Sequence, residues 1–201
     1  MATPPKQERS KATEQNMLDA AEELLHNGNA EQVTVESVVR LSGATVGSFY
    51  ARFGNVEGLF EALHQRYLTS LYESKIFEAL NQSIEQPDLK SGLRLGCKTL
   101  IEFAYEKRKL FAYFITHPSE DAVMVRRVGY ESMLNNLKAH RSEVVHKDLK
   151  RASEHTTRLI YQTILGVVFV EPSNFIGRKT SIKEIVDSTT QMAYAYLTTE
   201  S

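Results

Sequence analysis

The segment SGATVGSFYARFGN, residues 42–55, gathers residue types that contact phosphate groups. Gly43 and Gly47 leave backbone amides open to a ligand, and the Thr45 hydroxyl can cap a helix whose amides bind an anion. A nucleotide-binding P-loop has these properties, but it requires G-x-x-x-x-G-K-[ST] after a strand. Here the glycine spacing differs, no lysine follows and no strand pattern precedes. The segment therefore does not predict a nucleotide site.

A helix–turn–helix accounts for the same residues. Apolar residues at helical spacing, Val35, Val38, Val39 and Leu41, predict one short helix over 35–41, with Thr34 as its cap. A second helix is expected over 46–52, with Thr45 as its cap. The turn around Gly43 has the length that joins the two helices of this motif.

The second of these helices has two different faces. Phe49 and Phe53 are expected to face inward together with Val38 and Val39, which braces the helix. The outward set is small, polar or basic and contains no acid: Val46, Gly47, Ser48, Ala51 and Arg52. The missing Cβ of Gly47 would let the backbone approach a DNA groove closely. A helical hairpin inside an ordinary bundle, with Gly47 there for packing, explains the same spacing and stays open.

Charge does not single out nucleic acid as a partner. The 201 residues carry a formal net charge of −1, and residues 1–60 hold five basic and eight acidic side chains. The window 40–54 contains two arginines and no acid. Any attraction to phosphate must therefore be local to that window.

The remaining sequence reads as helix. Met17 to Leu25 carry an apolar stripe, and Asn55 can cap a helix that carries Phe60 to Leu71. Further helices are expected over 89–105, 106–116, 120–141, 148–170 and 180–198. With no alternating strand pattern, we expect an all-α fold preceded by a flexible polar tail over residues 1–12.

The run from Met17 to Phe60 resembles the N-terminal domain of TetR-family transcriptional regulators. The matching features are L-x-A-A-x-x-L-L in the first helix, Thr34, the turn at Gly43, Gly47, and Tyr50-x-x-Phe53 followed by Glu57 and Leu59. The resemblance implies a three-helix DNA-binding domain over 13–60 and a ligand-sensing, dimerising domain over 61–201. It also implies phosphate contacts from Thr34, Thr45, Tyr50 and Arg52, and base-edge contacts from Val46, Gly47, Ser48 and Ala51.

Some residues depart from the family pattern. Val56 stands where the family commonly has a lysine at the start of the fourth helix. Glu14, Asn16 and Glu36 stand at or near positions that are basic in other members. Together with the excess of acids, these departures imply weak or salt-sensitive DNA binding, or a lost DNA function.

The resemblance also implies a small-molecule pocket in the C-terminal domain. Aromatic and apolar residues of three expected helices are the candidates for lining it: Phe103, Phe111, Phe114, Tyr130, Leu134, Tyr161 and Leu165. Simple core packing explains any one of them equally well.

The two C-terminal helices are candidates for a homodimer interface. Apolar residues run nearly all round 159–170, and the last helix has an apolar stripe over 182–197. Such helices need cover on two sides, and a second copy is one source of it. A helix buried at the centre of a monomer is the alternative.

Other functional classes find little support. The six histidines are scattered without metal-ligand spacing, and no nucleophile elbow or paired carboxylates occur, so we expect no enzyme, metal or cofactor. The apolar stretch 159–170 is too short to span a membrane. Cys97 shares an apolar helical face with Leu93, Leu100 and Ala104, which predicts a buried thiol in a protein of the reducing cytoplasm.

We therefore expect a homodimeric repressor that binds a palindromic double-stranded DNA operator and responds to a small-molecule effector. The alternative is a TetR-like dimer that binds a small molecule or a protein partner and has lost sequence-specific DNA binding.

Overall fold

The protein is helical throughout the part of the chain that the structure describes. The computed structural model describes residues 6–73, 75–116, 120–170, 172 and 177–200. These residues form α-helices and two short 3₁₀ turns and contain no strand, which confirms the predicted all-α fold. The elements are α1 (Lys6–Asn27), η1 (Ala30–Gln32), α2 (Val35–Ser42), α3 (Val46–Phe53), α4 (Val56–Glu73), α5 (Ile76–Ile84), α6 (Leu89–Glu106), α7 (Arg108–Thr116), α8 (Glu120–Ala139), η2 (Arg141–Glu143), α9 (Leu149–Phe169) and α10 (Ile182–Thr198).

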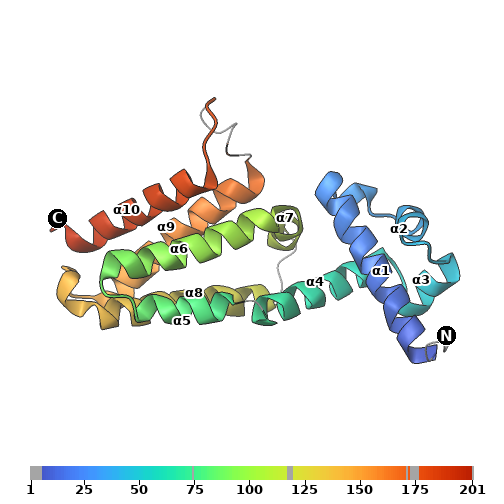
Figure 1. The fold of residues 1–201 in the computed structure, drawn as a ribbon, viewed down its shortest axis with the longest axis horizontal. Coiled ribbons are helices and arrows are strands. Elements are labelled where there is room, and N and C mark those ends of the chain that lie inside the picture. Colours follow the sequence, from blue (N-terminus) through green and yellow to red (C-terminus); the bar gives the residue numbers. More distant parts are fainter. Residues whose placement is uncertain (1–5, 74, 117–119, 171, 173–176, 201) are drawn as a thin grey trace. The chain divides into compact units, whose positions relative to one another are not determined.

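Contacts divide the chain into two compact units. The first, here called the head, ends at Glu73 and contains α1 to α4; the second, the body, begins at residue 74 and contains α5 to α10 (Figure 1). The helix α4 therefore belongs to the head by its contacts. The expectation of a functional boundary at residue 60 stays a prediction, because contacts assign no function.

The head is built on α1, which packs against α2 and α4. Met17, Leu18, Ala21 and Leu25 of α1 are buried, as the apolar stripe of this helix predicts. The helix begins earlier than expected, at Lys6, so residues 6–12 are helical and the prediction of a flexible tail over them was wrong. These residues have no apolar stripe that would have revealed the helix. Residues 1–5 of the expected tail lie outside the described residues.

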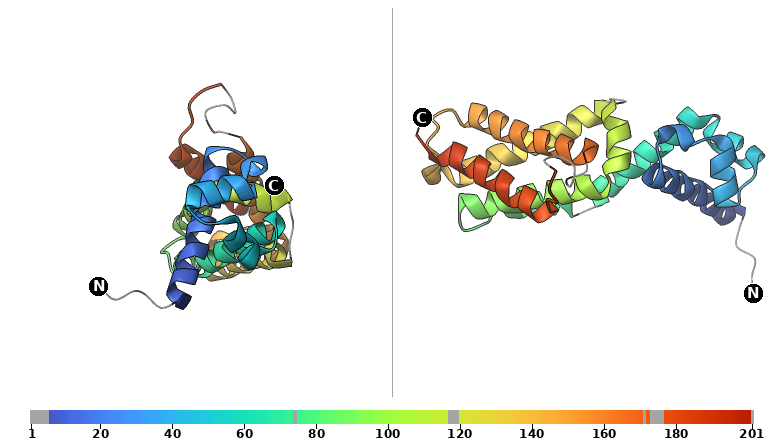
Figure 2. Two further views of the ribbon diagram at one scale, coloured as in Figure 1. Left: turned by 90° about the vertical axis from the view of Figure 1, so that its right-hand side faces the viewer. Right: turned by 90° about the horizontal axis from the view of Figure 1, so that it is seen from above.

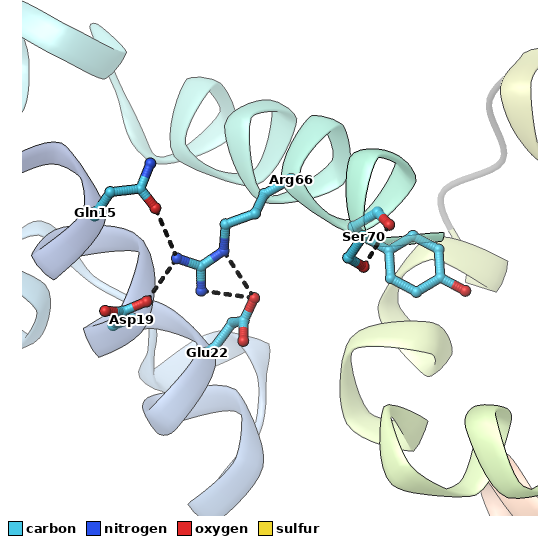
Figure 3. A network of polar contacts seen from close by, with 6 residues as sticks. Gln15, Asp19, Glu22, Arg66 and Ser70 are labelled. Carbon is cyan, nitrogen blue, oxygen red and sulfur yellow. Dashed lines mark hydrogen bonds and ion pairs between the residues drawn. The ribbon is translucent and has the colours of Figure 1, made fainter. Parts of the chain in front are cut away.

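A polar network holds α4 against α1 inside the head (Figure 3). The Arg66 guanidinium lies 2.6 Å from an Asp19 carboxylate oxygen and 2.7 Å from one of Glu22, and it donates to Gln15 Oε1 at 3.4 Å. Burial alone lowers the pKa of Arg66, but the hydrogen bonds and charges of Glu22 and Asp19 more than offset it, so the pKa is raised. Arg66 is thus held in its charged form between two turns of α1.

The body is organised around α6, which contacts α5, α9 and α10 (Figures 1 and 2). One end of α6 contributes Leu89 and Leu93 to an apolar cluster with residues of α8, α9 and α10. The other end contributes Cys97, Ile101 and Ala104 to a second cluster with α9 and α10. Cys97 is fully buried, as predicted, and burial raises the pKa of its thiol to about 11, an effect that the neighbouring Thr190 only partly offsets.

The predicted long helices occur within a few residues of their expected limits. The structure also contains α5, a helix that the sequence patterns did not predict. Lys75 precedes it without a capping hydrogen bond from its side chain, so the usual sign of a helix start is missing. In the described residues, no helix has the length and apolar character that spanning a membrane requires.

Candidate functional site

The segment from Thr34 to Phe53 forms two short helices joined by a tight turn. Thr34 accepts a hydrogen bond from the Ser37 amide at 3.1 Å, and the Ser37 hydroxyl accepts one from the Thr34 amide at 2.9 Å, so α2 starts with a capping box. Gly43 ends α2 with a φ of 68°, a conformation that glycine adopts without strain. Thr45 then caps α3 by accepting from the Ser48 amide at 3.1 Å.

Apolar contacts fix the orientation of α3. Val38 of α2 and Phe49 of α3 are fully buried, and Phe53 is buried beside them. The Phe49 and Phe53 rings meet edge to face with their centroids 5.3 Å apart, a favourable arrangement for aromatic pairs. Val39 is half-buried rather than fully inward. The inward face of the predicted helix–turn–helix is therefore present.

The part of the α3 surface that is not buried presents an apolar and an aromatic side chain to solvent. Val46 is 51% exposed and Tyr50 is 52% exposed, and Leu41 at the end of α2 is 44% exposed. Thr34, Thr45, Gly47 and Ala51 are also exposed, and Ser48 is half-buried. The sequence pattern assigns Leu41 to the apolar stripe of α2, and the structure corrects this by exposing it. Arg40, which is also exposed, lies next to it in the chain.

Gly47 has no packing role among the residues that the structure describes. A Cβ placed on Gly47 would meet no atom within 4 Å, and its φ is not positive. At Gly58 of α4, by contrast, a Cβ would lie 1.9 Å from the Phe53 carbonyl oxygen, so packing requires that glycine. No packing contact among the described residues therefore requires a glycine at position 47, which argues against the alternative of a packing role. The open space at Gly47 leaves room for an external partner to approach the backbone closely.

Arg52 does not project outward as expected. Its guanidinium donates to the Ser48 carbonyl at 3.1 Å, and to both the carbonyl and the hydroxyl of Ser10 at 3.0 Å. The side chain is half-buried between α3 and the first turns of α1. The earlier start of α1 explains the difference, because it brings Ser10 within reach of a long side chain whose direction spacing alone does not determine.

The head thus collects the features of a surface that contacts an anionic polymer. The first-turn amides of α3 lack acceptors within the helix and are suited to a phosphate. Thr34 and Thr45 are exposed at the starts of α2 and α3, and Tyr50 is exposed in the second turn of α3. Against this, Glu36 is exposed in the first turn of α2, and Val56 begins α4 without a charge. These exposed residues stay candidates for DNA contact, and few basic groups accompany them.

The body contains a small cavity of about 40 Å³. Side chains and glycines of α5, α6, α8 and α9 line it, among them Ser83, Gly92, Gly129, Met133, Asn136 and Thr157. The aromatic and apolar candidates from the sequence are not among the lining residues: Phe103, Phe111, Phe114, Tyr130, Leu134, Tyr161 and Leu165. Phe111 packs against the apolar cluster around Cys97, and Phe114 is buried. Their role in ligand binding stays a prediction.

Comparison with known proteins identifies the head. Residues 17–63 match the family model described as bacterial regulatory proteins, tetR family. The head of this chain is a TetR-family domain. The match begins at Met17 of α1 and ends at Leu63 of α4, so it contains the whole helix–turn–helix. None of the curated proteins has a sequence that matches this chain.

The fold of this TetR-family head and its body recurs in solved structures. SmeT, the repressor of the Stenotrophomonas maltophilia multidrug efflux pump SmeDEF, has a TM-score of 0.66 at 20% identity over 95% of this chain and 93% of SmeT. NalD, the secondary repressor of the MexAB-OprM multidrug efflux pump in Pseudomonas aeruginosa, has a TM-score of 0.63 at 20% identity over 95% of this chain and 98% of NalD. PfmR, a TetR-family transcriptional regulator from Thermus thermophilus, has a TM-score of 0.63 at 16% identity over 90% of this chain and 96% of PfmR. At these identities the likeness establishes the fold alone.

Proposed function

We propose that the protein is a ligand-responsive transcriptional repressor. In this proposal a homodimer binds a palindromic DNA operator through α3 of each head. A small molecule bound in the body favours a dimer geometry whose heads no longer match the operator. Such a change works only through a difference in the ligand's affinity for the two states.

The observation that carries the DNA-binding part is the exposed face of α3. Val46 and Tyr50 are about half exposed, and Gly47, next to Val46 in the chain, has open space where a Cβ would lie. Val46 is suited to contact a thymine methyl group, and Tyr50 to donate to a phosphate. Ser48 and Ala51 are small enough to let the helix enter a major groove.

A dimer is supported by apolar surface on the last two helices of the body. Phe169 at the end of α9 is 53% exposed, and Met192 of α10 is 50% exposed. A Cβ on Gly166 of α9 would meet nothing within 4 Å, so a second helix has room to approach there. We propose that 159–170 and 182–197 pair with the same helices of a second copy, as isologous interfaces do.

Repression and ligand response rest on the family and on its structural relatives. SmeT and NalD are repressors of multidrug efflux pumps, and both share the fold of this chain. A repressor of this kind acts in the cytoplasm, where the chromosome is. The cavity of the body supports the proposal of a small-molecule effector.

A second function is favoured by Arg52, which is engaged by Ser10 rather than free to meet a phosphate. The position of Arg52, the uncharged Val56 and the excess of acidic residues in the head together support this second function. It is that of a dimer that binds a small molecule and has lost specific DNA binding. Selection of the purified full chain from randomised duplex DNA, at about 50 and 200 mM salt, separates the two functions. A palindromic motif supports the repressor. Enrichment that vanishes at the higher salt without a motif, or no enrichment at all, supports the second function.

A further inference from the structure

The cavity of the body has an apolar wall and an uncharged lining. Apolar side chains in the wall include Leu80 of α5, Leu93 and Leu100 of α6, and Ile160 of α9. The described residues that line the cavity include no acidic or basic side chain. A charged group buried there would lack a partner, which costs far more free energy than burying a neutral one.

Asn136 of α8 supplies an unpaired hydrogen-bond acceptor to this lining. The residue is 2% exposed, and its Nδ2 donates to the Ser83 carbonyl at 2.8 Å and to the Ser83 hydroxyl at 3.2 Å. The Ser83 hydroxyl in turn donates to the Leu80 carbonyl at 2.6 Å. Because a carbonyl oxygen only accepts, these bonds fix which end of the carboxamide faces Ser83. The other end, Oδ1, is buried without a hydrogen-bond partner.

Thr157 of α9 supplies a second unpaired group. Threonines in helices commonly donate to the carbonyl four residues earlier. In α9, Thr156 donates to Ala152 at 2.9 Å and Thr163 donates to Leu159 at 3.1 Å in this way. The Thr157 hydroxyl is buried and makes no such bond, although it also lines the cavity. Buried polar groups are almost always satisfied, so two exceptions in one cavity indicate a ligand group that pairs with them.

We propose that this cavity binds the uncharged, hydrogen-bond-donating head group of an apolar small molecule, with Asn136 Oδ1 and Thr157 Oγ1 as its anchors. A hydroxyl or a primary amide donates to Asn136 Oδ1 and pairs with the Thr157 hydroxyl, which can donate or accept. The inference rests on the proposed function, because it names the chemical class of the effector that the body senses.

The geometry discriminates between head groups. A carboxylate would present its oxygens to Asn136 Oδ1, which also only accepts, and would find no cation in the lining. An ammonium group would find an acceptor but no carboxylate. The cavity of about 40 Å³ holds a head group alone, well under the roughly 300–1,000 Å³ of pockets that enclose a drug-sized ligand. The apolar part of the ligand therefore extends beyond this cavity.

Calorimetric titration of the full chain, without DNA, tests the proposal with four probes of similar length: n-hexanol, hexanamide, hexanoate and methyl pentyl ether. We expect n-hexanol and hexanamide to bind at least about tenfold more tightly than hexanoate and the ether. Hexanoate is charged, and the ether cannot donate a hydrogen bond. The loss of one hydrogen bond accounts for a factor of this size. Equal binding of n-hexanol and the ether, or no binding of any probe, overturns the proposal.

Variants of α9 provide the matched controls. Thr157→Val removes the unpaired hydroxyl and should weaken n-hexanol binding about tenfold, whereas Thr157→Ser keeps the hydroxyl and the affinity. Thr163→Val removes a hydroxyl that its own helix satisfies, and should leave n-hexanol binding unchanged. Unchanged affinity in Thr157→Val overturns the assignment of the anchor. If the protein binds an operator in a separate assay but binds none of the probes, this inference alone is overturned. If it binds n-hexanol but no specific DNA, the proposed function is overturned and this inference stands.

Discussion

Replacing Gly47 by alanine should make the protein more stable and DNA binding weaker. Alanine favours a helix over glycine by about 1 kcal/mol, and somewhat less is expected in the first turn of α3. The added methyl group meets no atom within 4 Å in the free chain, so no steric cost offsets the gain. For a chain of this size, about 1 kcal/mol corresponds to a rise of about 2–4 °C in Tm.

The same methyl group should weaken DNA binding, because it enters the space between α3 and the groove. Forcing an extra methyl group into a well-packed contact costs about 1–3 kcal/mol, which corresponds to about 5- to 150-fold in Kd. Thermal unfolding and fluorescence anisotropy with a selected duplex measure the two effects separately. Gly58→Ala serves as the opposite control, because its Cβ would lie 1.9 Å from the Phe53 carbonyl oxygen and should lower Tm. Unchanged DNA affinity in a stabilised Gly47→Ala would refute the placement of Gly47 at the DNA surface.

Four further outcomes are expected. Tyr50→Ala should weaken binding to every duplex by a similar factor, because a phosphate contact carries no sequence information. Fluorescence anisotropy with specific and random duplexes measures the change in affinity, and a loss confined to one sequence would contradict the phosphate contact. Arg66→Met should lower the free energy of unfolding by about 1–2 kcal/mol, because it leaves the carboxylates of Asp19 and Glu22 without their cation. Urea denaturation measures this loss, and an unchanged unfolding midpoint would contradict a stabilising role for these ion pairs. Asp88 caps α6 and accepts hydrogen bonds from Ser91, which lowers the pKa of its carboxyl group. Its contribution to stability is therefore present above the unfolded-state pKa and is lost as the pH falls through the folded-state pKa. Asp88→Asn should flatten this acid dependence in unfolding curves, and an unaltered curve would contradict the prediction. Cys97, whose pKa is raised to about 11 by burial, should react with iodoacetamide at neutral pH only after denaturation, and rapid labelling of the native chain would contradict its burial.

Most of the head was predictable because its signals are local. Thr34 and Thr45 mark the starts of α2 and α3, and the amide of Gly58 donates to Asn55 Oδ1 at 2.8 Å, as the expected cap of α4 requires. Caps and apolar spacing depend on neighbours in sequence, so a single sequence reveals them. The direction of Arg52 was not predictable, because a long side chain takes its partner from tertiary structure.

The body was predictable in its helices and not in its cavity. The caps Asp88 and Ser181 and the apolar faces determine where α6 and α10 begin. The cavity depends instead on how residues distant in sequence come together: Asn136 and Ser83 are 53 residues apart, and Thr157 comes from a third helix. The aromatic residues near 103–114 are conspicuous in the sequence, whereas a polar asparagine inside a helix carries no local sign that its oxygen will be buried without a partner.

We propose above all that the exposed face of α3 reads DNA sequence. Parallel selections from randomised duplex DNA with the wild-type chain and with Val46→Ala test it most directly, since Val46 is exposed and its truncation leaves the buried face of α3 intact. We expect a palindromic motif for the wild type. For the variant we expect the same motif with relaxed preference at one symmetric pair of positions. Identical motifs for both chains, or no motif for the wild type, would contradict it.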